Sequence, residues 1–226
     1  MTVDQRAAKR LRELELRPGP VTFCDVDEVV LDFIDPFRTF LRGHGLTLTA
    51  RSFRLNGNIV DDGGKPCDPD RVARLLDRFF ATQDQFQTLA PGAIEGLSAI
   101  AERSQVVLLT AMRHGHFDTR ERHLRDLGID YPLVTTEGSK GLAIAGLELD
   151  GTVTFIDDLP GNHADVLTAA PHATAIHYMS NAEFSALLPP LPDGVLRAAD
   201  WEEVVAHFES EVNNKGTSIV DAVAGG

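Results

Sequence analysis

Short runs of apolar residues alternate along the chain with longer segments of helical periodicity. The runs are rich in β-branched side chains and too short for buried helices, so they predict buried strands of a parallel sheet. They cover Val21–Cys24, Val106–Leu109, Val153–Ile156 and Ala173–Ile176, with a weaker run at Leu133–Thr135. Helical patterns lie at Ile94–Arg103, Phe117–Leu127, His163–Ala169 and Asn181–Leu188. Strands that alternate with helices predict an α/β fold with a Rossmann-like parallel sheet.

One long stretch, residues 25–105, breaks this alternation between the first and second runs. It is much longer than one crossover connection needs. Helical patterns at Phe33–His44 and Asp68–Phe80 flank a Gly/Asp-rich loop at Asn56–Cys67. We therefore predict a small helical cap domain over residues 31–88, inserted in a core formed by residues 1–30 and 89–212. The polar, Gly-containing segment 213–226 is predicted to be a flexible tail.

Charge and composition narrow the classes of partner. With 34 acidic and 21 basic residues the formal net charge is −13, which disfavours binding to a nucleic acid polymer or an anionic membrane. No apolar run approaches the roughly 20 residues of a membrane span, and the charged N-terminal segment lacks the apolar centre of a signal peptide. The two cysteines form no C-x-x-C metal pair. We expect a cytoplasmic protein, in which any anionic substrate needs a local cation.

Polar residues follow the predicted strands at the points where those strands end. Asp25 and Asp27 follow the first strand, Thr110 ends the second, and Asp157-Asp158 end a later one, with Lys140 between them in sequence. In an open parallel sheet, ligands bind beyond the carboxyl ends of the strands. These residues are therefore expected to line one crevice.

Several carboxylates in one crevice repel one another unless a cation neutralises them. Oxygen ligands without nearby His or Cys are typical of a hard ion, and Mg²⁺ is the predicted cofactor. A carboxylate can attack phosphorus to form an aspartyl-phosphate, and a second carboxylate can transfer protons to the leaving group and from water. Lys140 and Thr110 are expected to hold the phosphoryl oxygens.

Four motifs in this order resemble the haloacid dehalogenase superfamily of aspartate-nucleophile phosphohydrolases. The first is an apolar strand followed by Asp-x-Asp-x-Thr/Val, here Val21-Thr-Phe-Cys-Asp-Val-Asp-Glu-Val29. The second is an apolar strand that ends in Ser or Thr, here Val106-Val-Leu-Leu-Thr110, and the third is a lysine, Lys140. The fourth is an apolar strand that ends in two acids, Thr154-Phe-Ile-Asp-Asp158. The position of the insertion is similar to that of the cap found between the family's first two motifs.

The resemblance implies a role for each matching residue. Asp25 is the implied nucleophile and Asp27 the implied general acid/base. The implied metal ligands are the carboxylate of Asp25, the backbone carbonyl of Asp27 and the carboxylate of Asp158, with Asp157 acting through a metal-bound water. Lys140 is implied to neutralise the nucleophile and the phosphoryl group, so that the catalytic set is Asp25, Asp27, Thr110 and Lys140.

The chain departs from the family pattern at Glu28, because the family commonly has Gly after the second Asp. Two interpretations are open: the side chain points toward the cap boundary and helps to select the leaving group, or it is solvated. The Asp-x-Asp-Glu-Val run also occurs in the deoxyribonucleotidase-like branch, which makes a nucleotidase-like activity one option. Arg113 and His114 follow Thr110 and either touch the substrate or lie at a solvated junction.

The predicted function is a Mg²⁺-dependent phosphatase that acts on a small phosphorylated metabolite such as a nucleotide or a sugar phosphate. A phosphomutase of the same fold is the alternative, since it differs only in whether water or a sugar hydroxyl takes the phosphoryl group. A receiver-like signalling module also uses Asp, Thr, Lys and Mg²⁺, but there the acidic pair precedes the phosphoacceptor. The sequence leaves the physiological substrate, the pathway and the oligomeric state open.

Overall fold

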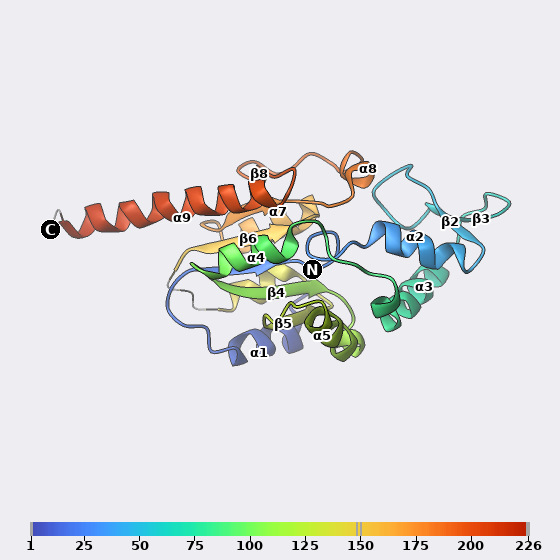
Figure 1. Ribbon diagram of the computed structural model, residues 1–226, viewed down its shortest axis with the longest axis horizontal. Coiled ribbons are helices and arrows are strands. Elements are labelled where there is room, and N and C mark those ends of the chain that lie inside the picture. Colours follow the sequence, from blue (N-terminus) through green and yellow to red (C-terminus); the bar gives the residue numbers. More distant parts are fainter. Residues whose placement is uncertain (1, 148, 150, 225–226) are drawn as a thin grey trace.

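A parallel sheet forms the centre of the protein (Figure 1). The computed structural model describes residues 2–147, 149 and 151–224, and side chains up to residue 213. Among these residues the larger sheet has six strands in the order β5-β4-β1-β6-β7-β8, and every pair of neighbours is parallel. The strands are β1 (Val21–Cys24), β4 (Gln105–Ala111), β5 (Leu133–Thr136), β6 (Val153–Asp157), β7 (Thr174–His177) and β8 (Leu196–Arg197). The predicted α/β fold with a Rossmann-like parallel sheet is confirmed.

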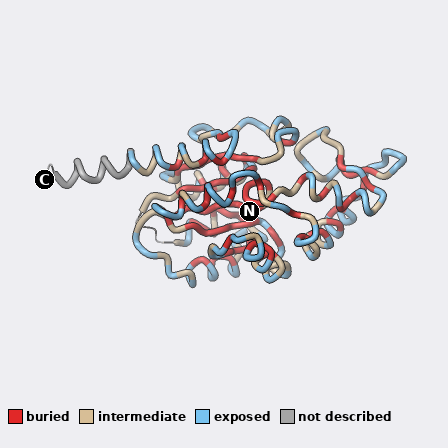
Figure 2. Tube along the Cα trace, viewed as in Figure 1, coloured by how far each residue is buried: buried red, intermediate tan, exposed pale blue. Residues whose placement is uncertain are grey.

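Helices cover both faces of this sheet, which explains why successive residues of β1, β5 and β7 are buried rather than alternately buried and exposed. On one face α4 (Ala93–Ala101), α5 (Phe117–Asp126) and α9 (Trp201–Ala224) share a buried cluster with Cys24, Leu108 and Ile156. On the other face α1 (Gln5–Glu13), α6 (Lys140–Ala145) and α7 (Pro160–Ala169) pack on Phe23 and its neighbours. In Figure 2 the buried trace runs through the sheet between these two layers.

The inserted segment packs around an aromatic cluster of its own. It contains α2 (Ile34–Arg42), α3 (Pro69–Ala81), the short 3-10 helix η1 (Gln83–Gln85) and an antiparallel hairpin of β2 (Leu46–Leu48) and β3 (Ile59–Asp61). Its buried residues include Phe37, Phe40 and Phe79, and Phe184 of the core helix α8 (Ala182–Ser185) joins them. Figure 1 shows the hairpin at the end of this unit that is farthest from the sheet.

The two linkers that join the insertion to the sheet run side by side. Leu31 pairs with Leu89 in an antiparallel bridge, and the amide of Asp32 donates to the carbonyl of Thr88 at 2.9 Å. The amide of Ala90 donates in turn to the carbonyl of Val30. Residues 31–88 thus begin and end at one paired crossing point, and we keep the division into core and cap as a proposal.

Two features differ from the sequence predictions. The cap is not purely helical, because residues on each side of the Gly/Asp-rich loop pair as the β2-β3 hairpin. The predicted flexible tail is helical up to Ala224, as a continuation of α9, and residues 225–226 lie outside the described part. Within the described residues, no helix is both long and apolar enough to cross a membrane.

Candidate active site

Three buried carboxylates meet at the carboxyl ends of two neighbouring strands. β1 and β6 pair in register, with Cys24 opposite Ile156, so the residues that follow them, Asp25 and the Asp157-Asp158 pair, come together. One ligand oxygen from each of these three carboxylates lies within 4.8 Å of the others. All three residues are buried. The predicted crevice therefore brings together the first and fourth motifs.

Lys140 is the cation that faces these carboxylates among the described residues. Its Nζ lies 2.8 Å from Oδ1 of Asp25 and 2.7 Å from Oδ2 of Asp157, and the side chain is 1% exposed. Its place on α6 is fixed by the N-cap Ser139, whose hydroxyl accepts from the amide of Leu142. Burial lowers the pKa of Lys140, but the charges of Asp157 and Asp25 outweigh burial and raise it above its ordinary value. Lys140 is therefore a permanent cation.

One ammonium does not balance three carboxylates. Burial raises the pKa of Asp25 to about 7, with Lys140 opposing the rise and Asp157 adding to it. Burial and the charges of Asp157 and Asp25 also raise the pKa of Asp158. Buried carboxylates remain ionised only with a partner of opposite charge. A divalent cation with oxygen ligands would supply that charge, so this donor set fits Mg²⁺.

Asp157 has a structural task that the sequence did not reveal. Its Oδ2 accepts from Lys140, and its Oδ1 accepts from the amide of Leu159 and from Nδ2 of Asn162, both at 2.9 Å. Both oxygens are thus engaged by the protein. The geometry favours Asp157 as an anchor for Lys140, while its implied contact through a metal-bound water stays a prediction.

Two buried histidines hold the backbone of the acidic pair. Nε2 of His163 contacts the carbonyl of Asp157, and Nε2 of His177 contacts the carbonyl of Asp158, both at 3.0 Å. Burial lowers the pKa of both rings, to about 4 for His177. Both rings are therefore neutral donors at neutral pH, and they fix the loop that carries the two carboxylates.

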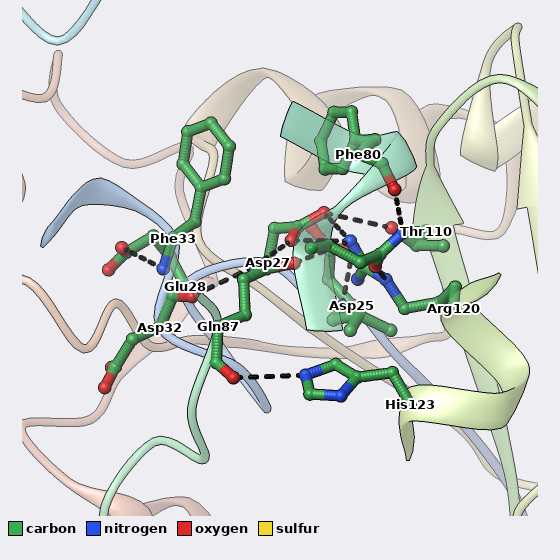
Figure 3. A network of polar contacts seen from close by, with 12 residues as sticks. Asp25, Asp27, Glu28, Asp32, Phe33, Phe80, Gln87, Thr110, Arg120 and His123 are labelled. Carbon is green, nitrogen blue, oxygen red and sulfur yellow. Dashed lines mark hydrogen bonds and ion pairs between the residues drawn. The ribbon is translucent and has the colours of Figure 1, made fainter. Parts of the chain in front are cut away.

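Asp27 lies on the other side of the crevice and has a cation of its own. Its carboxylate pairs with Nη2 of Arg120, which lies 2.9 Å from Oδ1 and 3.1 Å from Oδ2 (Figure 3). Nε2 of Gln87 donates to Oδ1 at 2.8 Å. The hydroxyl of Thr110 lies 3.5 Å from Oδ2. The structure thus places Thr110, the second-motif hydroxyl, beside Asp27.

Glu28 connects three parts of the protein, namely the loop that follows β1, the start of α2 and the core loop at residues 180–181. Its φ of 63° lies in the left-handed region that favours glycine. Its carboxylate accepts from the amides of Phe33 and Ile34, where α2 begins, and from the hydroxyl of Ser180 and the amide of Asn181. The side chain is buried, and burial raises its pKa. The interpretation of Glu28 as solvated is therefore wrong, and its effect on the leaving group stays a prediction.

The basic side chains after Thr110 contact acidic residues outside the group of Asp25, Asp157 and Asp158. Arg113 pairs with Asp77 of α3 at 3.1 Å, and His116 contacts the same carboxylate at 2.9 Å. His114 contacts Asp4 at 2.9 Å and the hydroxyl of Thr135 at 2.7 Å. Arg113 and His116 thus connect core and cap, and His114 connects the loop to the N-terminal segment.

The sequence reasoning missed Arg120 and its two glutamine partners. Arg120 lies in the charged run Phe117-Asp-Thr-Arg-Glu-Arg-His-Leu-Arg-Asp126, which has the composition of a solvated helix. In the structure its side chain is fully buried. Nε of Arg120 donates to the side chain of Gln83, and Nη2 lies 3.3 Å from Oε1 of Gln87. The only sequence signal was its helical spacing from His123, whose Nε2 contacts the carbonyl of Gln87 at 3.1 Å.

Comparisons with solved structures find the same fold elsewhere. A haloacid dehalogenase-like family hydrolase from Xanthomonas campestris is 14% identical with a TM-score of 0.57, over 89% of this chain and 99% of that one. A haloacid dehalogenase-type protein from Bacillus subtilis bound to magnesium is 14% identical with a TM-score of 0.52, over 85% and 99%. A haloacid dehalogenase family hydrolase from Deinococcus radiodurans with bound phosphate and sodium is 19% identical with a TM-score of 0.50, over 83% and 93%.

These likenesses settle the fold. Neither the models of protein families nor the curated proteins give a match to this sequence. The chain nevertheless has the haloacid dehalogenase-like fold, as the order of its four motifs predicts, and it spans nearly the whole length of these relatives. At such low identity the activity has to be argued from the site itself.

Proposed function

We propose that this protein is a Mg²⁺-dependent phosphatase that hydrolyses a small phosphomonoester through an aspartyl-phosphate. The observation that carries this proposal is the buried group of Asp25, Asp157 and Asp158 around Lys140 at the carboxyl ends of β1 and β6. The magnesium bound to the Bacillus subtilis protein and the phosphate bound to the Deinococcus radiodurans protein support it.

In the first step, a carboxylate oxygen of Asp25 attacks phosphorus while the bond from phosphorus to the leaving oxygen breaks. Asp27 gives a proton to that oxygen, so that the product leaves as an alcohol. Lys140 already contacts Asp25 at 2.8 Å, and it holds the carboxylate in place while negative charge gathers on the phosphoryl oxygens. Thr110 supplies a hydroxyl donor from the end of β4.

In the second step, water attacks the phosphorus of the aspartyl-phosphate. Asp27, now ionised, takes a proton from that water while the bond from phosphorus to Asp25 breaks. Inorganic phosphate leaves and both aspartates return to their starting states. Asp25 and Asp158 are the residues that would hold Mg²⁺ with the carbonyl of Asp27, and the bound ion would neutralise the carboxylates and the phosphoryl group.

We propose residues 31–88 as the cap that closes over the crevice and excludes water. A nucleotide or a sugar phosphate is the proposed class of substrate, because the run Asp25-Val-Asp-Glu-Val29 resembles that of the deoxyribonucleotidase-like branch. The two cysteines are buried and free, which is consistent with the proposed cytoplasmic location.

The proposal is tested by a screen of nucleotides, sugar phosphates and other small phosphomonoesters for release of inorganic phosphate. We expect activity with Mg²⁺, none in excess EDTA, and recovery when Mg²⁺ is returned. Full activity in excess chelator contradicts the metal. Failure to release phosphate from any ester, together with no acid-stable phosphoprotein after rapid quenching, contradicts the phosphatase.

The same screen separates the phosphatase from the phosphomutase. A mutase returns the phosphoryl group to another hydroxyl of the substrate, so a phosphorylated isomer accumulates and little inorganic phosphate appears. Analysis of the products by ³¹P NMR distinguishes the two outcomes directly.

A further inference from the structure

Arg120 stands outside the four motifs, yet its Nη2 contacts both carboxylate oxygens of Asp27. It projects from the middle of α5, on the face of the helix that also carries His123. Its side chain is 0% exposed, whereas that of Asp27 is 18% exposed. A fully buried guanidinium is costly unless its donors are satisfied. The arrangement of its donors therefore indicates what the residue does.

Two donor nitrogens of Arg120 point in different directions, and the third, Nη1, has no hydrogen-bond partner among the described residues. Nη2 reaches both oxygens of Asp27, on the core side of the crevice. Nε reaches Gln83 in η1, and the guanidinium lies 5.6 Å from the ring centroid of Phe80, in the last turn of α3. Figure 3 shows Arg120 entering between Asp27 and Phe80. One planar group thus touches the catalytic loop and the end of the cap together.

Gln87, in the linker that leads from the cap back to the sheet, also connects Asp27 to the cap. Gln87 lies between η1 and the sheet, and its Nε2 donates both to Oδ1 of Asp27 and, at 3.0 Å, to the carbonyl of Asp32 in the first linker. From the core, His123 holds the carbonyl of Gln87. Asp27 is therefore bound to α5 and to residues 82–88 at once, and a shift of this linker changes the contacts of its carboxylate.

We infer that Arg120 is a positioning residue that holds the carboxylate of Asp27 and ties its orientation to the cap linker 82–88. The inference rests on the proposed function, in which Asp27 transfers protons to the leaving group and from water. In the arrangement described, both carboxylate oxygens accept from Arg120. Movement of the cap displaces Gln83 and Phe80, and with them the guanidinium, which frees Asp27 to meet the leaving oxygen.

The first test uses two esters that differ in their need for a general acid. A nitrophenyl phosphate releases a stable anion and needs little proton transfer, whereas an alkyl phosphate such as glycerol phosphate needs much. For Arg120→Met we expect kcat/KM to fall about 10-fold to 100-fold more for the alkyl ester than for the nitrophenyl ester. Arg122→Met, at an exposed position of the same helix, is the matched control and should affect neither ester.

If Arg120 had only a structural role, Arg120→Met would lower kcat/KM equally for both esters. That result overturns the inference. Because loss of a buried arginine can impair folding, Gln83→Met provides a second variant that retains both Arg120 and Asp27. It should show the same unequal loss at a smaller size. Arg120→Lys keeps the charge but loses the planar fork, and should recover only part of the alkyl-ester activity. Full recovery by lysine, or equal losses for Gln83→Met, would also contradict the inference.

The second test does not depend on activity. In substrate-free protein, Arg120→Met and Asp27→Asn should each raise the hydrogen-exchange rates of the amides of residues 82–88 by about 10-fold, equivalent to about 1.4 kcal/mol. Arg122→Met should leave these rates unchanged. Unchanged exchange rates in Arg120→Met and Asp27→Asn overturn the inferred connection to residues 82–88, whether or not the protein hydrolyses an ester. Conversely, raised exchange rates in a protein that hydrolyses no ester would contradict the proposed phosphatase and still support the connection between Arg120 and residues 82–88.

Discussion

Asp25 and Asp27, the two proposed catalytic aspartates, lie two residues apart but have differently built surroundings. Asp25 faces Lys140 and the Asp157-Asp158 pair, all of them buried and all carried by the sheet or by α6 next to it. Asp27 faces Arg120, whose other contacts are with the end of the cap and its linker. Each aspartate thus has a cation of its own, one fixed to the core and the other shared with the proposed cap.

The difference suits the two tasks. A nucleophile and its metal site need fixed geometry, which strand ends and buried histidines provide. A group that gives a proton in one step and takes one in the next has to change partners between steps. Contacts to a linker allow this, because linkers adjust their backbone more readily than paired strands do. Five experiments test this difference between the two aspartates.

The largest effect is expected for Asp25→Asn. Removal of the nucleophile should lower kcat by at least about 10⁴-fold and abolish the phosphoprotein. Asp130→Asn, at a side chain that is 84% exposed, is the matched control and should retain full activity. Quenched-flow detection of labelled phosphoprotein measures the result. A phosphoprotein that persists in Asp25→Asn would move the nucleophile elsewhere.

Asp27→Asn should lower kcat by about 10²-fold to 10⁴-fold, because proton transfer to the leaving group and from water is lost. In contrast to Asp25→Asn, the nucleophile remains, so a nitrophenyl ester should still phosphorylate the protein. The intermediate should then accumulate, because its hydrolysis has lost the base. Single-turnover kinetics measure both steps, and a normal rate of hydrolysis would refute the assignment.

Lys140→Met should lower the free energy of unfolding by about 3–5 kcal/mol, since it leaves buried carboxylates without their cation. Arg120→Met should cost less, because Asp27 is 18% exposed whereas Asp25 and Asp157 are 8% and 0% exposed. Urea unfolding in EDTA compares the two variants. An equal or larger loss for Arg120→Met would remove the distinction between a buried half and a more accessible half.

The histidines behind the acidic pair predict a pH dependence of stability. Burial, together with the charges of His163 and Arg197, lowers the pKa of His177 to about 4 in the folded protein, against about 6.5 when unfolded. Between pH 4 and pH 6.5 the folded state therefore binds fewer protons than the unfolded state. Stability should fall by about 1–3 kcal/mol as the pH drops from 6.5 to 4. His177→Gln, unfolded by urea at several pH values, should show a smaller slope over this window. If the unfolding free energies of the two proteins depended on pH with the same slope, the lowered pKa of His177 would be refuted.

The smallest effect is expected at the surface contact between core and cap. Asp77→Asn weakens the pairs with Arg113 and His116, and Asp77 is 43% exposed. Exposed pairs contribute at most about 1 kcal/mol, so kcat/KM should change by less than about fivefold. Steady-state kinetics on the best substrate measure this. A larger loss, confined to kcat, would mean that this contact and not Arg120 governs the cap.

Local sequence determined the sheet and half of the site. The apolar runs at Val21–Cys24 and Val153–Ile156 are short and β-branched, and parallel strands must end at one edge, so Asp25 and Asp158 were bound to meet. The metal half could thus be predicted. Lys140 was predicted at the same edge from its position in the sequence between Thr110 and Asp157, and it lies at the start of α6, which follows β5.

Only the tertiary structure decided the surroundings of Asp27 and Glu28. Arg120 is 93 residues from Asp27 in sequence, and Ser180 is 152 residues from Glu28. A charged residue in a polar helix or loop has the same local pattern whether it is solvated or buried. What buries it is a partner that another segment brings, and neither periodicity nor spacing encodes that partner. Local sequence thus placed Asp25 and Asp158 at one edge of the sheet, whereas the packing of residues 31–88 against the core placed Arg120 beside Asp27.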